Sequence, residues 1–289
     1  MPPPAIDFAR KIKDILKHVE PLVDEARAPI LHYRRTVANI WGMLDHVETA
    51  FGSSGIPEAV VDRHLDRLYL MAVVNLVETF ERFLKEAAAV CVDHLAKLVV
   101  DDRFDGFPIQ GSSLASHFGA ETLGKSLCES SVWLDCSEIN KRFRKLLSDP
   151  FGATGTPFDL FPTSRQKPSD ECWRFEVMTL VWQIRHTTVH NVGVITRSDA
   201  VKLSVMAKEA VTPAVILAPT RADLVFLKQF LDDTTEVFNK RIAERLAALL
   251  TTIHAQAPTL LAPADVANRL TELFDLSVTI AGVAGVVPP

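Results

Sequence analysis

An arginine and two histidines lie within six consecutive residues in the second half of the chain. Arg185 is followed directly by His186, and His190 comes four residues later. Histidine titrates near neutral pH, so it can accept a proton and later donate one. Arginine keeps its charge and presents a planar set of donors that suits a phosphate. These residue types fit phosphodiester cleavage, in which a hydroxyl loses a proton, a leaving oxygen gains one and a cation stabilises the charge on phosphorus.

A helix is expected to position these residues. Between residues 173 and 192, apolar side chains recur every three or four positions, which is the spacing of one face of an α-helix. Gly193 can adopt a positive φ and so end this helix just after Asn191. On a regular helix Arg185 and His190 lie about 140° apart around the axis, so they converge only if the helix end unwinds or a second chain contributes.

The order of these residues resembles the motif of the HEPN family of nucleotide-binding domains, in which an arginine, a polar residue, a spacer and a histidine end a core helix. A second stretch, Phe80 to Glu86, resembles that family's earlier core helix, because Glu81 lies within an apolar and aromatic run. Both segments occur in the family's order, and the resemblance, which is to the RiboL-PSP-HEPN type, covers roughly residues 57–245. Many HEPN proteins are metal-independent ribonucleases, and others are inactive binding or scaffold modules.

The resemblance implies roles for individual residues. His190 would act as acid and base, Arg185 would bind the phosphate, and His186 would orient it. Glu81 would hold the arginine or the histidine in place. Two further substrate-binding positions follow from the same correspondence: Asn191 and Thr187. Two such motifs meet across a dimer in HEPN ribonucleases, so a homodimer is implied.

By the same resemblance the protein would cut RNA, such as tRNA or mRNA, through attack of a 2′-hydroxyl on its own phosphate. The products would be a 2′,3′-cyclic phosphate and a 5′-hydroxyl, and the reaction would need no cofactor and no metal. Many family members are toxins of toxin–antitoxin systems or antiviral effectors, so the resemblance also implies a possible antitoxin protein as a further partner. The alternative is a catalytically inactive HEPN-like protein that binds RNA or a nucleotide, or that serves as a dimeric scaffold.

Two other interpretations of the motif stay open. In a purely structural one, Arg185 pairs with Glu78 or Glu81 in the core while His190 caps the end of its helix. In the other, the two histidines, four residues apart on one helical face, ligate zinc. However, Thr187 occupies the position where a zinc hydrolase carries its catalytic glutamate, and no third ligand occurs at a diagnostic spacing. The sequence therefore predicts no metal site.

A basic segment lies in the long stretch between the two core helices. Lys141, Arg142, Arg144 and Lys145 are four cations within five residues, interrupted by Phe143. Such a segment can follow phosphates while the aromatic ring stacks on a base. The alternative is the solvated face of an amphipathic helix. Because long insertions between core helices are often functional, we expect this segment to border the site.

Periodicity predicts a mainly all-α fold class, and the resemblance implies a HEPN-like bundle. A small β element is expected after Gly193, from the β-branched stretches over residues 194–196, 201–205 and 215–217. Its core helices are expected over residues 57–99, 169–192 and 220–254, within a domain that spans 57–254 and carries an insertion over about 100–167. Residues 1–52 are expected to form a helical pair packed on this core. Residues 255–289 are expected to form a short helix and an apolar tail.

Composition limits the partners. No run of eighteen uncharged apolar residues occurs, so no membrane span is expected. The net charge of -5 disfavours broad electrostatic binding of nucleic acid, so any RNA contact must be local. The four cysteines are scattered, with no Cys-x-x-Cys pair, which fits a reduced, cytoplasmic protein.

Overall fold

The computed structural model describes residues 28–99, 102–104, 107, 122–129, 133–149, 158–162, 172–258 and 263–280. These residues form helices and no sheet, which confirms the all-α fold class. In chain order the elements are α2 (Pro29–Gly52), α3 (Glu58–Leu95), the 3₁₀ turn η1 (Asp102–Phe104), α5 (Leu123–Glu129), α6 (Cys136–Leu146), α7 (Cys172–Asn191), α8 (Arg197–Ala207), α9 (Arg221–Gln256) and α10 (Pro263–Phe274).

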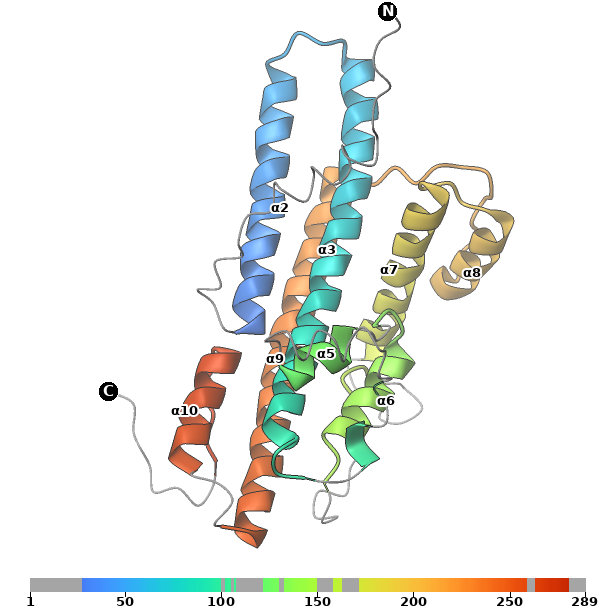
Figure 1. Cartoon of the computed structure of the whole chain (residues 1–289). Coiled ribbons are helices and arrows are strands. Elements are labelled where there is room, and N and C mark those ends of the chain that lie inside the picture. The colour runs from blue at the N-terminus through green and yellow to red at the C-terminus, as the bar shows by residue number, and fades with distance from the viewer. Residues whose placement is uncertain are drawn as a thin grey trace, which may run out of the picture.

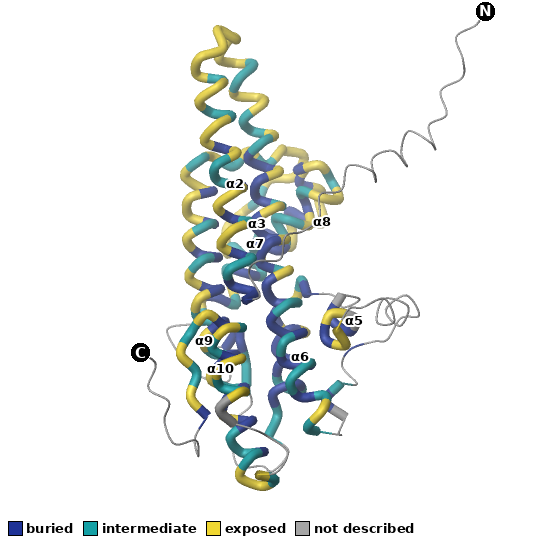
Figure 2. The backbone as a smooth tube through the Cα atoms, turned by 60° about the vertical axis from the view of Figure 1, so that its left-hand side comes forward, coloured by how far each residue is buried: buried dark blue, intermediate teal, exposed yellow. Residues whose placement is uncertain are grey.

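The three longest helices, α2, α3 and α9, run side by side and form the centre of the bundle (Figure 1). Each carries apolar residues at steps of three and four, and these stripes are buried against one another. Figure 2 shows the resulting division, with buried positions along the inner faces and exposed positions outside. α3 extends over 38 residues as one helix, so it supplies a continuous support for α5 and α7 as well as for α2 and α9.

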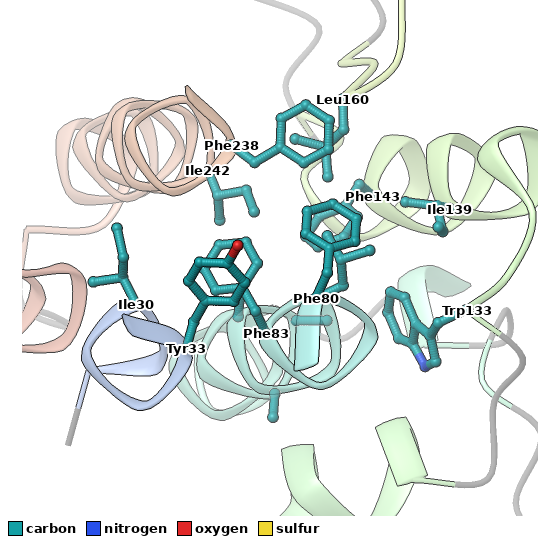
Figure 3. Close-up of a cluster of buried hydrophobic side chains, with 14 of the residues drawn as sticks. Ile30, Tyr33, Phe80, Phe83, Trp133, Ile139, Phe143, Leu160, Phe238 and Ile242 are labelled. Atoms are coloured by element: carbon teal, nitrogen blue, oxygen red, sulfur yellow. The ribbon is translucent and has the colours of Figure 1, made fainter. Parts of the chain in front are cut away.

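Aromatic rings from four segments meet in the centre of the core (Figure 3). Tyr33 of α2 meets Phe83 of α3 edge-on, with 6.2 Å between ring centroids. Phe80 of α3 lies 6.2 Å from Phe238 of α9, and Phe238 meets the ring of Phe161 at 4.7 Å. Edge-to-face pairs of this kind add to the free energy of burial, so these rings fix how the helices pack.

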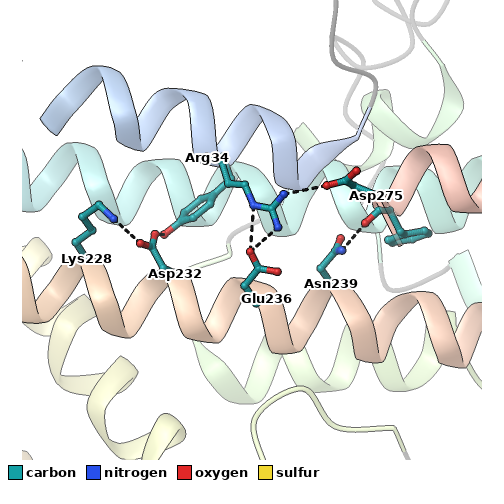
Figure 4. Close-up of polar contacts among 8 residues, drawn as sticks. Arg34, Lys228, Asp232, Glu236, Asn239 and Asp275 are labelled. Carbon is teal, nitrogen blue, oxygen red and sulfur yellow. Dashed lines mark hydrogen bonds and ion pairs between the residues drawn. The ribbon is translucent and has the colours of Figure 1, made fainter. Parts of the chain in front are cut away.

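A polar seam ties α2 to α9 beside this aromatic core (Figure 4). Arg34 donates to Glu236, at 2.6 Å from its nearest nitrogen, and to Asp275 at 2.9 Å. The hydroxyl of Tyr33 donates to Asp232 at 2.9 Å. Burial of the Tyr33 ring, together with the Asp232 carboxylate, raises the pKa of this phenol, so the hydroxyl remains a donor at neutral pH.

α7 ends where the sequence predicted, after Asn191. Val192 and Gly193 both adopt left-handed backbone conformations, with φ of 53° and 81°. The Gly193 amide donates back to the Thr187 carbonyl at 3.3 Å, which is the kind of bond that closes a helix end. The chain then reverses and pairs at a single bridge between Val194 and Ile216.

Of the three β-branched stretches expected to form a β element, those that contain Val194 and Ile216 pair as one isolated bridge, and only the expectation for residues 201–205 is wrong. Residues 201–205 belong to the helix α8, and the isolated bridge is the only β pairing in the described residues. α8 begins with a capping box, because the Thr196 hydroxyl accepts from the Asp199 amide at 3.1 Å and the Asp199 carboxylate accepts from the Thr196 amide at 3.3 Å. Val201 and Val205, whose β-branched side chains suggested a strand, lie on the exposed face of α8.

A close contact holds α5, one of the described parts of the insertion, against α3. The Gly124 amide donates to the Asp93 carboxylate at 2.8 Å. A Cβ at position 124 would lie only 2.2 Å from the Ala89 carbonyl oxygen, so only glycine fits this crossing.

Much of the insertion, the N-terminal helix predicted before residue 28 and the last residues of the predicted tail lie outside the described residues. No helix within the described residues has the length and apolar character needed to cross a membrane.

Candidate functional site

Arg185 projects from α7 toward α3, where its guanidinium meets the Glu78 carboxylate at 3.0 Å. Only 16% of the Arg185 side chain is exposed, against 47% for Glu78. The pair therefore lies at the edge of the core, with the carboxylate nearer to solvent. The Arg185 Nε is buried and has no acceptor among the described residues.

The role predicted for Glu81 is corrected by this arrangement. Glu81 lies almost one helical turn beyond Glu78 on α3 and pairs with Lys85 at 3.3 Å. Its carboxylate is thus engaged along its own helix, and the acidic partner of Arg185 is Glu78. The interpretation in which Arg185 pairs with an acidic residue of α3 is satisfied by this contact.

The two histidines lie next to each other on the outer side of α7. Their ring centroids are 4.5 Å apart, with an angle of 46° between the ring planes. Both His186 and His190 are exposed. Two imidazoles at this distance can act on one phosphate, one as a base and the other as a cation or an acid.

Asp199 of α8 gathers polar groups from the end of α7. Its buried carboxylate accepts from Gln183 at 3.1 Å, from Asn191 at 2.8 Å and from the Thr196 hydroxyl at 2.7 Å. Burial alone would raise the pKa of this carboxyl, but the bonds from Thr196 and Asn191, together with nearby His186, lower it overall. Asp199 is therefore an anion that fastens α8 to α7 beside the histidines.

Thr187 and Asn191, which were predicted to bind substrate, instead contact other parts of the protein. Thr187 is fully buried, so its side chain does not reach a substrate. Asn191 is half-buried, and its amide nitrogen is bound to Asp199. Thr187 thus belongs to the packing of α7, and Asn191 positions α8.

The basic segment forms helix α6, and most of its groups are engaged in structure. Arg144 makes a two-point contact with Asp159, both bonds being 2.7 Å. Arg142 lies over the Trp133 ring at 5.0 Å. Phe143 is fully buried, so its predicted stacking on a base is wrong.

The remaining two cations of α6 differ in exposure. Lys141 is exposed and lies 3.8 Å from Glu138, while Lys145 is half-buried. α6 approaches α7 through its first residue, whose thiol lies 3.9 Å from the Phe175 carbonyl, and then leads away from the C-terminal half of α7 (Figure 1). The segment therefore borders the site at one end only.

A pocket of about 240 Å³ opens beside the motif, between the start of α6, α7 and α8. It is lined by Arg185 and His186 together with Asp135, Gln183 and Lys202, among others. The spacing of the motif does not predict Asp135, Asp199 or Lys202, because they come from other elements. A signal for α8 was present in the sequence, since Thr196-x-x-Asp199 is a capping-box pattern that places Lys202 one turn later.

Within the described part of the chain, no three histidine, cysteine, aspartate or glutamate side chains are placed so that they could hold a metal ion. His186 and His190 lie next to each other. His186 also lines the pocket of about 240 Å³, together with Arg185 and Lys202. The arrangement can bind an anion and move protons next to it. Comparison with protein-family models found no match, and comparisons with curated proteins and with solved structures found none either.

Proposed function

We propose that the protein is a metal-independent endoribonuclease whose active site contains Arg185, His186 and His190. The observation that carries this proposal is the placement of two exposed imidazoles 4.5 Å apart beside an arginine held by Glu78. A fixed cation suits the charge that develops on phosphorus, and paired imidazoles suit proton transfer. The resemblance of the motif to HEPN ribonucleases supports the same activity.

In the proposed reaction the 2′-oxygen attacks the adjacent phosphorus and the bond from phosphorus to the 5′-oxygen breaks. His190 takes the 2′-hydroxyl proton and, as the protonated imidazole, then supplies that proton to the 5′-oxygen. Arg185 stabilises the extra negative charge. His186, which lies near enough to Asp199 to help lower the pKa of its carboxyl, orients the phosphate. The products are a 2′,3′-cyclic phosphate and a 5′-hydroxyl, so protons and bonds balance without an added cofactor.

A homodimer is part of the proposal. Arg185 turns toward α3 while His190 faces outward, so a second copy supplies further groups to one phosphate. Support comes from an apolar patch of exposed side chains beside the motif, two of which, Met71 and Val192, line a pocket of about 420 Å³ between α3 and α7. Contiguous exposed apolar side chains mark association surfaces. The patch consists of Met71, Val192, Val194 and Ile216.

The test is incubation of the purified protein with total RNA and tRNA in EDTA, beside Arg185→Ala and His190→Ala. Arg35→Ala and His46→Ala are matched controls, because both residues are exposed on α2, away from the site. Cleavage that persists in EDTA, is lost in both site variants and is retained in both controls supports the proposal. Cleavage abolished by EDTA, or unchanged in the site variants, contradicts it.

We also propose, from the same resemblance, that the enzyme acts as a toxin of a toxin–antitoxin or antiviral defence system. Expression of the wild type is then expected to arrest growth, whereas folded His190→Ala is tolerated.

The alternative function is an inactive binding or scaffold protein. The Arg185–Glu78 pair favours this alternative, because the carboxylate neutralises part of the charge that catalysis would use. Normal growth on expression, together with intact RNA in the cleavage assay, would select it.

A further inference from the structure

The pocket beside the motif has a mainly apolar floor and a polar rim. Its floor includes Trp182, Cys136 and Met206, whose side chains are mainly apolar. Its rim carries polar groups from three helices, among them Lys202 of α8 and Asp135 at the cap of α6. At about 240 Å³ the pocket is smaller than the roughly 300–1,000 Å³ of typical small-molecule sites, so it suits one compact group.

Two residues that line the pocket each carry a buried donor that has no acceptor among the described residues: the Trp182 Nε1 and the Arg185 Nε. Trp182 is only 6% exposed, and its ring is fixed edge-on against Phe161 at 5.9 Å. A buried donor without a partner costs on the order of 1–3 kcal/mol, which a bound acceptor recovers. A ligand that brings acceptor atoms into the wall of the pocket would satisfy these two donors.

The rim of the pocket supplies both a hydrogen-bond donor and a hydrogen-bond acceptor. Lys202 is exposed, forms no ion pair within the described residues and lies beside His186 in the pocket lining. Asp135 uses one carboxylate oxygen to cap α6, at 2.9 Å from the Glu138 amide. Its other oxygen can accept from a ligand. A flat group with acceptors and donors around an apolar face matches this combination better than a bare phosphate does.

We propose that this pocket receives one unstacked nucleobase of an RNA strand, next to the phosphate that Arg185 and the histidines hold. The inference rests on the proposed function, because it places the base beside the bond to be cut. Proteins read single-stranded RNA by taking a base out of the stack and bonding its polar edge. The Trp182 and Arg185 donors would bind base acceptors, and Lys202 would contact a neighbouring phosphate.

The first arm of the test measures base preference in cleavage. The full-length protein cuts a single-stranded RNA with randomised sequence, and sequencing of the new ends gives the preference at each position around the cut. For the wild type we expect at least a tenfold preference at one position. Trp182→Phe, which removes the donor but keeps a ring, should reduce this preference about fivefold or more. Lys202→Gln, at the exposed rim, should lower cleavage several-fold and leave the preferred base unchanged.

Two variants are matched controls for these changes. Trp173→Phe alters an exposed indole on the same helix, and Lys240→Gln alters an exposed lysine of α9. Both should cut like the wild type. Thermal unfolding of each variant identifies loss of fold. Because the Lys202 side chain is exposed, Lys202→Gln should leave the fold intact, and its effect on cleavage then reports on RNA contact. A wild type that cuts without base preference, or a Trp182→Phe variant that keeps the full preference, overturns the pocket inference and leaves the ribonuclease proposal standing.

The second arm does not depend on cleavage. Calorimetric titration with the four nucleoside 3′-monophosphates and with inorganic phosphate measures binding directly. Binding of one nucleotide at least tenfold tighter than phosphate, and lost in Trp182→Phe, supports the pocket even if no RNA is cut. Equal binding of all four nucleotides and phosphate would make this an anion site and overturn the inference, as would the absence of nucleotide binding.

Discussion

At the scale of single residues, an arginine held by a carboxylate gains a fixed position and loses part of its attraction for a phosphate. Glu78 has this double effect on Arg185, at 3.0 Å. Glu78 and Glu81 are three residues apart on one helix, and only the rotation of α3 against α7 decides which of them faces the arginine. That rotation is set by core packing, which the motif alone does not contain.

Replacement of Glu78 tests this assignment. Glu78→Ala removes the group that orients Arg185, and we expect kcat/KM for RNA cleavage to fall about tenfold, since small displacements of a catalytic group cost this much or more. Glu81→Ala is the matched control and should stay within about twofold of the wild type, because its partner is Lys85. The opposite pattern would restore the role that the sequence assigned to Glu81.

The lowered pKa of Asp199 predicts how the free energy of unfolding depends on pH. Its pKa in the folded protein lies below the ordinary value of about 3.9, so its bonds stabilise the fold fully above about pH 4 and are lost as the pH falls through the lowered pKa. Asp199→Asn should reduce the free energy of unfolding at pH 7 by about 2 kcal/mol. In urea titrations the difference between wild type and variant should shrink below about pH 4. A difference that is constant from pH 7 to pH 3 would contradict this account.

At the scale of elements, the crossing of α5 over α3 has a sharp steric requirement. Gly124→Ala places a methyl group 2.2 Å from the Ala89 carbonyl oxygen, so backbone must move. We expect a loss of roughly 1–3 kcal/mol in the free energy of unfolding. Gly42→Ala in α2, where nothing lies within 4 Å of the added Cβ, should instead stabilise by about 0.5–1 kcal/mol. Denaturant midpoints measure both, and equal effects would refute the steric argument.

The helices themselves follow from the sequence where an apolar stripe is long. The stripes of α3 and α9 repeat over many turns, and the cap of α9 at Thr220 and Asp223 is visible in the sequence and present in the structure. α8 was misassigned because it is short and its valines favour strands. Its capping box, which involves Asp199, was the stronger signal.

The site was only partly predictable for a related reason. Spacing along α7 identified Arg185 and the two histidines, because they belong to one helix. The pocket residues Lys202 and Asp135 come from α8 and α6, and their approach to α7 depends on tertiary packing. Phe143 was misread for the same reason, since a buried and an exposed aromatic residue look alike within a basic segment.

At the scale of the whole molecule, a net charge of -5 limits how RNA is held. If three cations at the site contact the strand, the slope of log affinity against log salt for single-stranded RNA should be about -2. Lys202→Gln should reduce its magnitude by about 0.7. Fluorescence anisotropy with a 2′-O-methylated RNA measures the slope without cleavage. A slope steeper than about -4 would indicate binding over a broad surface such as α6.

The proposed dimer gives a second prediction at this scale. Met71→Glu and Val192→Glu each place a charge in the apolar patch, and desolvating that charge opposes association. Sedimentation should show a shift from dimer to monomer, with a parallel loss of RNA cleavage. Met43→Glu, on α2 away from α7, is the matched control and should remain dimeric. A wild type that sediments as a monomer at all concentrations contradicts the dimer.

The α2–α3 hairpin reaches past the ends of α7 and α9, and its connection at residues 52–59 is exposed (Figures 1 and 2). Exposed tips of this kind tolerate additions. Cys91, Cys128 and Cys136 are buried, and burial raises the pKa of the Cys91 and Cys136 thiols, which leaves them poorly reactive. Cys172 is only half-buried, so it would first be replaced by serine, and a thiol introduced by Ser54→Cys would then take up a maleimide dye preferentially. Energy transfer between two such dyes would then measure how far apart the two tips stand in an assembled pair.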